Sequence, residues 1–303
     1  MKVPEFLARA SRSRKKLAGA AGLLLVALAV PTALSFTSGA GAATDPTLGA
    51  AGPFGVLSST YTNTAIGTTI NGDLGYLTGP AVAPTVSGTT YVGGSTYAQA
   101  GIDQGSALAS LNSQACTFTF PPGAVNLATD TSHGPLGIYT PGVYCTTATS
   151  AASIGTAGIT LSGSGTFIFR IDGALTTVAN SSVTFANGAS ACDLYWTPAA
   201  ATTLGATSTF AGTDIDASGV TVGSTVTWTG RALAFGGTVS TTSDTITVPT
   251  CSSTSTTTTT ATPTTTTPTT TTSSPTTTTA PAPSKVRKAP KSPLAPASVP
   301  VTG

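Results

Sequence analysis

Apolar residues and small polar residues alternate over short stretches through most of the chain after Pro141. These stretches are rich in Thr, Val, Ile and Phe, and Gly or Asn-Gly separates them. Such alternation between turn residues is typical of short, half-buried β-strands. The predicted strands are residues 159–161, 166–171, 182–185, 193–196, 220–222, 225–228 and 245–248.

One stretch has the spacing of a helix instead. Residues 95–114 place apolar side chains near the helical period, and Ser95 could cap the first turn. Gly101 and Gly105 lower the helix propensity, at about 1 kcal/mol each if they are exposed. Small residues also allow close packing, so the two glycines are candidate contact points for a neighbouring element. The apolar residues of this stretch are Ala98, Ile102, Leu108 and Leu111.

The predicted strands recur at intervals of about 18 to 25 residues, which suits the coils of a β-solenoid. A β-sandwich would also give many short strands. The solenoid is favoured because Gly-Thr-Val/Ile segments recur without strong hairpin signals between them.

The two ends of the chain differ from this central part. Residues 1–42 combine a basic start, an apolar run and an Ala-x-Ala site, which predicts a cleaved secretory signal peptide. Pro31 breaks the run, so a retained membrane anchor is less favoured. Residues 252–303 are mostly Thr, Ser, Pro and Ala, and they predict a disordered stalk with a short basic tail. The folded domain is therefore expected at residues 43–251.

Charge limits the partners of this domain. From Leu48 onward it holds Arg170 and Arg231 against eight aspartates, which leaves six excess negative charges. Binding of nucleic acid through its phosphates is therefore not expected. The two arginines are expected to be structural and to form ion pairs with nearby aspartates.

Four cysteines lie in the domain, and an even number in an exported chain indicates disulfides. Three connectivities are possible, and we expect neighbours in sequence to pair. The cysteines are Cys116, Cys145, Cys192 and Cys251.

Five segments resemble, in order, the DUF3494-type ice-binding proteins of bacteria, fungi and algae. They are residues 48–75 (with the piece NGDLG), 140–144 (TPGVY), 165–177 (GTFIFRIDGALTT), 187–196 (NGASACDLYW) and 230–234 (GRALA). The resemblance implies a discontinuous right-handed β-helix of triangular cross-section, with one long α-helix packed alongside. It also implies that one flat face binds ice through recurring T-A/G-x-T/N-like strands.

The inventory of reactive residues does not favour an enzyme. His133 is the single histidine, and no Ser stands in a G-x-S-x-G turn. It is interpreted as a solvent-exposed loop residue. Asp214 and Asp216 point to the same side of a strand but are interpreted as solvated or turn-forming. A calcium site built on them has no motif spacing to support it, so we predict no catalytic residue, no cofactor and no metal.

The remaining feature is a surface of Thr, Ser and Ala. In a solenoid, stacked threonines would form a grid of methyl and hydroxyl groups with fixed rotamers, suited to ordering water and binding ice. Good strand propensity is the simpler explanation for Thr. By the family pattern, the candidate ice-binding residues are Thr156, Gly158, Thr160, Thr177, Ala179, Asn180, Ser218, Thr221, Thr238 and Ser240.

Two functions follow from these features. The first is a secreted, monomeric ice-binding protein that gives thermal hysteresis and inhibits ice recrystallisation. The second is a cell-surface adhesin that holds a solenoid head on a Thr/Pro stalk and binds carbohydrate or another cell. The basic tail suits association with an anionic cell wall. The terminal VPVTG is similar to an L-P-x-T-G sorting signal, although a chance match is the simpler interpretation.

Overall fold

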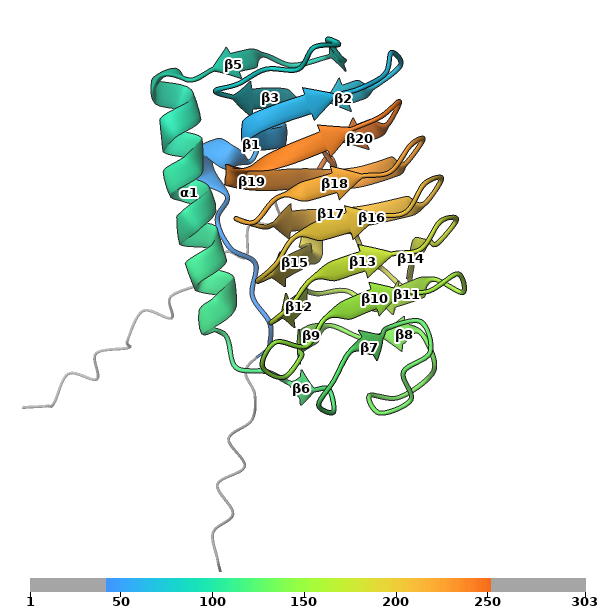
Figure 1. The fold of residues 1–303 in the computed structure, drawn as a ribbon. Helices are drawn as coiled ribbons and strands as arrows, with labels where there is room; N and C mark the ends of the chain where they lie inside the picture. The colour runs from blue at the N-terminus through green and yellow to red at the C-terminus, as the bar shows by residue number, and fades with distance from the viewer. Residues whose placement is uncertain (1–41, 252–303) are drawn as a thin grey trace, which may run out of the picture. The chain divides into compact units, whose positions relative to one another are not determined.

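The computed structural model describes residues 42–251, and every strand pairing in them is parallel. The predicted signal peptide and stalk lie outside the described residues. Successive strands wind around a common core, so that three stacks of strands form three faces (Figure 1). The expected fold, a mostly β, right-handed β-helix with one long helix alongside, is confirmed.

We name the faces A, B and C. Face A lies against the helix, and its stack is β6 (Phe118–Thr119), β9 (Gly142–Cys145), β12 (Phe167–Ile171), β15 (Leu194–Pro198), β17 (Thr209–Ile215), β19 (Thr227–Thr241), β1 (Phe54–Asn63), β3 (Asp73–Tyr76) and β5 (Thr90–Val92). Face B stacks β7 (Val125–Asn126), β10 (Ala152–Ile154), β13 (Leu175–Thr177), β16 (Thr202–Leu204) and β18 (Val220–Val222), followed by the ends of β19 and β1.

Face C completes the triangle. Its stack is β8 (Ile138–Tyr139), β11 (Ile159–Ser162), β14 (Val183–Ala186), the starts of β17 and β19, β20 (Thr245–Thr247), β2 (Thr69–Asn71) and β4 (Thr85–Val86). Both β17 and β19 run from face C into face A without a turn. Two short 3-10 helices, η1 (Gly49–Ala51) and η2 (Ala191–Asp193), lie between strands or before them.

The stack does not follow the order of the sequence. β1 pairs with β19 and β2 pairs with β20, so the first coil lies directly on the last one. In Figure 1 the blue strands accordingly lie beside the orange ones, and the green strands form the opposite end. The helix α1 (Gly94–Ser113) runs between these ends and returns the chain to β6. This arrangement makes the β-helix discontinuous.

The interior contains a file of aromatic rings in contact, stacked or edge-to-face, surrounded by aliphatic residues. Tyr144, Phe169, Trp196, Phe210 and Trp228 follow one another with ring centroids 4.5–5.4 Å apart. The indole N–H groups of Trp196 and Trp228 donate to the carbonyls of Ala211 (2.8 Å) and Gly212 (2.9 Å). Each coil contributes few side chains to the interior. Large rings are therefore needed to fill it, because small side chains would leave cavities.

The helix covers face A through a second apolar cluster that includes Leu57, Tyr97 and Leu233. Its cap differs from the expected one, because the N-cap is Gly93 and no side chain caps the first turn. Gly101 is a contact point as expected, since a Cβ there would collide with the ring of Phe235. Gly105, in contrast, faces open space.

Two disulfides form within the described residues. Cys116 bonds to Cys145 and Cys192 bonds to Cys251, which is the pairing of sequence neighbours. The first joins the segment after α1 to β9, and the second joins η2 to the last described residue. Within residues 42–251, no helix is long and apolar enough to cross a membrane.

Candidate functional site

Face B carries two outward rows of small uncharged residues. The polar file, one residue per coil in register, consists of Asn126, Ser153, Thr176, Thr203, Thr221, Ser240 and Thr62. The small file lies two residues earlier in each coil and consists of Ala124, Ala151, Ala174, Ala201, Gly219, Thr238 and Thr60. The residue between the two files points inward and is buried in every coil, as Val220 (1% exposed) illustrates.

These rows share one pattern of four residues: a small residue, then Ala, Gly or Thr, then a core residue, then Thr, Ser or Asn. It appears as Ser218-Gly219-Val220-Thr221, and its other copies are residues 59–62, 123–126, 150–153, 173–176, 200–203 and 237–240. Residues two apart in a strand are about 6.7 Å apart, and neighbouring strands are about 4.8 Å apart. Face B is therefore a regular grid.

The polar side chains on this grid are held in place. β-branched Thr has few rotamers, and some hydroxyls bond to their neighbours along the file. The Thr62 hydroxyl donates to Ser240 Oγ at 2.7 Å. Two residues further along these strands, the hydroxyls of Thr64 and Thr242 form a hydrogen bond of 2.8 Å. Neither file contains a charged residue. The grid can thus present methyl and hydroxyl groups to water at fixed positions.

Face C also has outward threonines but is less even. One row consists of Thr85, Thr69, Thr245, Thr227, Thr209 and Ser182. The next row includes Ala211, Thr229 and Thr247, and these three line a hollow of about 540 Å³. The hollow is also lined by residues 190–192 and 248–250, which stand beside the strands. Face C is therefore interrupted where face B is continuous.

The sequence-predicted site residues divide between faces B and C and two corners of the solenoid. Thr221 and Ser240 are neighbours in the polar file, and Thr238 belongs to the small file. Ser218 lies at the corner between faces A and B, where its hydroxyl donates to the Ala199 carbonyl at 3.2 Å. Thr156 lies at the corner between faces B and C, and Thr160 lies on face C, where the hydroxyls of Thr160 and Thr184 are 3.0 Å apart. Gly158, between them, was predicted as a site residue but is buried against Ser182.

The predicted segment from Thr177 to Asn180 is corrected in part. Thr177 is buried (7% exposed), and its Oγ1 accepts from the Gly205 N–H at 2.9 Å, so it holds two coils together rather than facing solvent. Ala179 and Asn180 lie at the exposed corner between faces B and C. Asn180, Thr207, Thr225 and Ser243 all have a φ of 57–61° at this corner. This left-handed backbone is costly for residues other than Gly.

Five members of the polar file were not predicted. Their signal is the four-residue pattern, which is visible only when the coil boundaries are known. The interval between equivalent residues varies from 18, between Thr203 and Thr221, to 27, between Thr176 and Thr203. A search for a fixed repeat therefore fails. The missed residues are Asn126, Ser153, Thr176, Thr203 and Thr62.

The expected arginine ion pairs are absent from the described residues. Arg170 donates from Nη1 to the Gln114 carbonyl at 2.7 Å, and Arg231 donates from Nε to the Gly52 carbonyl at 2.7 Å. Both arginines thus donate hydrogen bonds to backbone carbonyls of segments that are distant in sequence. In residues 42–251 the one ion pair joins His133 and Asp130.

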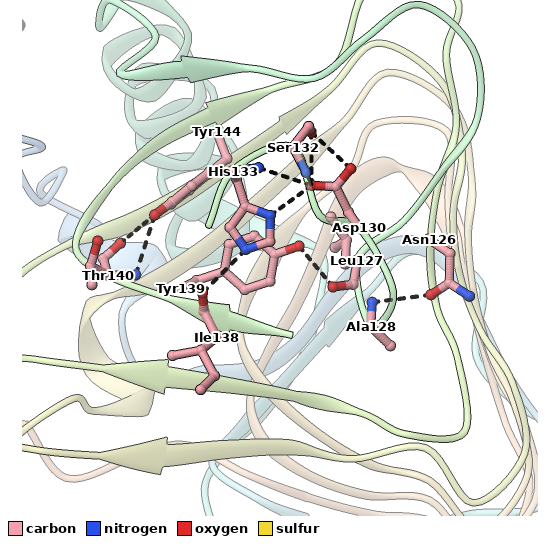
Figure 2. A network of polar contacts seen from close by, with 10 residues as sticks. All are labelled: Asn126, Leu127, Ala128, Asp130, Ser132, His133, Ile138, Tyr139, Thr140 and Tyr144. Carbon is pink, nitrogen blue, oxygen red and sulfur yellow. Dashed lines mark hydrogen bonds and ion pairs between the residues drawn. The ribbon is translucent and has the colours of Figure 1, made fainter. Parts of the chain in front are cut away.

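His133 is not the solvent-exposed residue that was expected. Its side chain is 2% exposed and stacks on Tyr139, with ring centroids 4.0 Å apart. Figure 2 shows Nδ1 facing Asp130 Oδ2 (2.7 Å) and Nε2 facing the Ile138 carbonyl (3.1 Å). Burial acts to raise the pKa of the Asp130 carboxyl, but hydrogen bonds from His133 and Ser132 outweigh it, and that pKa lies below its usual value. The histidine thus closes a loop at one end of the solenoid, with both ring nitrogens held by Asp130 and the Ile138 carbonyl.

Asp214 and Asp216 are also unlike the expectation of solvated or turn-forming residues, because both are fully buried. Burial raises the pKa of both carboxyl groups, and for Asp214 the charge of Asp216 raises it further. Asp244 is buried too, and burial raises its pKa to about 6 against hydrogen bonds from the N–H groups of Thr242 and Val226. In the described residues no group of three or more His, Cys, Asp or Glu side chains could hold a metal ion.

The sequence of this β-helix is similar to known proteins. The family model described as ice-binding-like matches residues 56–247, which contain most of the three faces. The chain belongs to this ice-binding family. It is 31% identical over 223 residues to an ice-binding protein of Flavobacterium frigoris (strain PS1), and the match covers 67% of this chain and 76% of the relative. It is 30% identical over 220 residues to ice-binding protein K3-B1 of Typhula ishikariensis, covering 66% and 88%.

Solved structures agree with this assignment to the ice-binding family. The ice-binding protein of the Antarctic ascomycete Antarctomyces psychrotrophicus matches with a TM-score of 0.61 at 27% identity, and the match covers 69% of this chain and all of that chain. The segments that carry the resemblance in sequence therefore belong to a β-helix of the family's kind.

Proposed function

We propose that this member of the ice-binding family is a secreted, monomeric protein that adsorbs to ice through face B. Adsorption there would give thermal hysteresis and inhibit ice recrystallisation. The observation that carries the proposal is the repetition of one four-residue pattern, in register, in seven coils of face B. That pattern matches the T-A/G-x-T/N-like strands expected from the family resemblance.

Physical chemistry supports face B over face C. A flat solid is best matched by a flat, rigid surface, whereas face C is interrupted by residues 190–192 and 248–250. Methyl groups along the files favour ordered water above them, while hydroxyl groups anchor that water by hydrogen bonds. Long charged side chains would disturb such an arrangement through their mobility and hydration, and the two files have none.

The aromatic residues argue against recognition of sugars as an alternative function. Phe167, Phe169, Trp196 and Trp228 are all at most 1% exposed, so none of them offers a ring for a sugar to stack on. We also infer no catalysis, because His133 is enclosed by Asp130 and Tyr139 and the two buried aspartates face the core.

A substitution pair within one coil tests the proposal. Thr221 lies on face B and Thr227 on face C, and both are exposed. Thr221→Tyr should abolish thermal hysteresis, because the protruding ring keeps the face off the ice, whereas Thr227→Tyr should leave it intact. Hysteresis is read by nanolitre osmometry, with circular dichroism as the folding control. The opposite result would move the ice-binding surface to face C.

A further inference from the structure

Two carboxyl groups lie inside the solenoid near the corner between faces A and B. Asp214 and Asp216 are two residues apart at the end of β17, so they point to the same side of the sheet, toward the core. Both are fully buried. In the neighbouring strands, Asp214 pairs with Trp196 and Ala232.

Asp216 connects two strands of the ice-binding face from behind. Its Oδ1 accepts from the N–H groups of Ser218 (2.6 Å) and Gly219 (3.3 Å), which lead into β18. Its Oδ2 accepts from the N–H of Thr202 (2.9 Å), which begins β16. These strands are adjacent in Figure 1 and carry neighbouring members of the polar file, Thr203 and Thr221. The Asp216 carboxylate thus holds together the starts of the two strands that carry Thr203 and Thr221.

Asp214 has no such partners. Neither of its carboxyl oxygens has a well-formed hydrogen bond, and the Thr202 hydroxyl, whose weak contact is the one that favours the charged form of Asp214, is likewise without a well-formed partner. An ionised carboxylate without partners in the core would be strongly unfavourable. The negative charge of Asp216 adds to this, since like charges at close range disfavour each other.

The other titratable groups near this strand face the opposite side. Tyr195 and Arg231 pair with Thr213, one residue away from Asp214, and therefore point toward α1. Arg231 is committed there to the Gly52 carbonyl and to Thr213 Oγ1 (3.2 Å). Trp196 and Ala232 contribute no charge on the core side. Asp216 is therefore the group whose charge acts on Asp214.

We propose that Asp216 is a positioning residue for the ice-binding face, and that a protonated Asp214 keeps the Asp216 carboxylate in place. The inference rests on the proposed function of face B. Ionisation of Asp214 would place two negative charges side by side in the core. Their repulsion would draw Asp216 away from its three N–H donors and loosen the corner of β16 and β18.

The test compares thermal hysteresis of the wild type and of Asp214→Asn from about pH 4 to about pH 10, the span between ordinary carboxyl and tyrosine pKa values. Asn has the shape of the protonated acid but cannot ionise. The ratio of wild-type to variant hysteresis should be near one at acid pH and fall as the pH rises. Asp244 titrates in both proteins, so its effect cancels in this ratio.

Two further variants separate positioning from general stability. Asp216→Asn places an amide N–H against the backbone donors and should lose hysteresis at every pH while remaining folded by circular dichroism. Asp172→Asn is the matched control, because Asp172 is an exposed carboxylate at the same kind of corner that accepts only from the Thr149 N–H (2.8 Å). It should behave as the wild type.

Amide hydrogen exchange at Thr202, Ser218 and Gly219 provides a readout without ice. Exchange there should accelerate with pH in the wild type beyond the intrinsic rate, and not in Asp214→Asn. A constant hysteresis ratio together with unchanged exchange would overturn the inference. Hysteresis that is absent from the wild type at every pH would instead refute the proposed function, whatever the exchange shows.

Discussion

Asp244 offers a quantitative test of how the solenoid corners are held together. Its carboxyl group is fully buried at the corner between faces B and C, where Oδ1 accepts from the Val226 N–H (2.8 Å) and Oδ2 from the Thr242 N–H (2.6 Å). Burial disfavours its charged form and raises its pKa from the usual 3.8 to about 6, despite these hydrogen bonds. The perturbation is Asp244→Asn, which removes the ionisation.

The sign of the effect follows from proton linkage. The folded state holds the proton more tightly than the unfolded state, so the contribution of Asp244 to stability is fully present below pH 4 and is lost as the pH rises through about 6. The difference between the two pKa values corresponds to about 3 kcal/mol. Asn cannot ionise, but it replaces one acceptor by a donor and should cost about 1 kcal/mol at all pH values.

The assay is denaturant unfolding of the wild type and Asp244→Asn at a series of pH values from about 4 to about 8. The free energy of unfolding of the wild type should fall by about 3 kcal/mol more than that of the variant over this range. Asp214 and Asp216 titrate in both proteins, so the comparison isolates Asp244. Parallel curves for the two proteins would show that the Asp244 carboxyl does not hold its proton more tightly in the folded state.

Two other expectations concern the helix and the disulfides. Gly105→Ala should raise the free energy of unfolding by about 1 kcal/mol, because the position faces open space and Ala favours helix. Gly101→Ala should lower the free energy of unfolding, because its Cβ would collide with Phe235. Equal effects of the two substitutions in thermal unfolding would contradict the packing of α1. Replacing both Cys192 and Cys251 by Ser should cost about 4 kcal/mol by freeing a loop of 59 residues, and an unchanged midpoint in denaturant would show that this disulfide is not needed to hold η2.

Much of the fold could be predicted because its determinants are local. The alternation of β-branched and small residues between glycines predicts the strands of coils such as residues 159–185, and helical spacing predicts α1 within one residue at each end. The stacking of β1 on β19 could not be predicted from such patterns. It joins strands about 180 residues apart, and only the family resemblance implied a discontinuous β-helix.

The site was harder to predict because exposure depends on the turn lengths. Thr177 and Thr176 are adjacent in sequence, yet Thr176 faces solvent on the polar file and Thr177 is buried beneath Gly205. A shift of one residue reverses the direction of a side chain in a strand. Asp214 and His133 show the same limit, since polar residues in turn-rich sequence are usually exposed and these two lie inside the structure.

The most direct test of the account is thermal hysteresis of three proteins measured side by side: the wild type, Thr221→Tyr and Thr227→Tyr. We expect hysteresis and faceted ice crystals for the wild type and for Thr227→Tyr, and freely growing round crystals for Thr221→Tyr. Hysteresis that survives in Thr221→Tyr, or round crystals with the wild type at high concentration, would contradict binding of ice through face B.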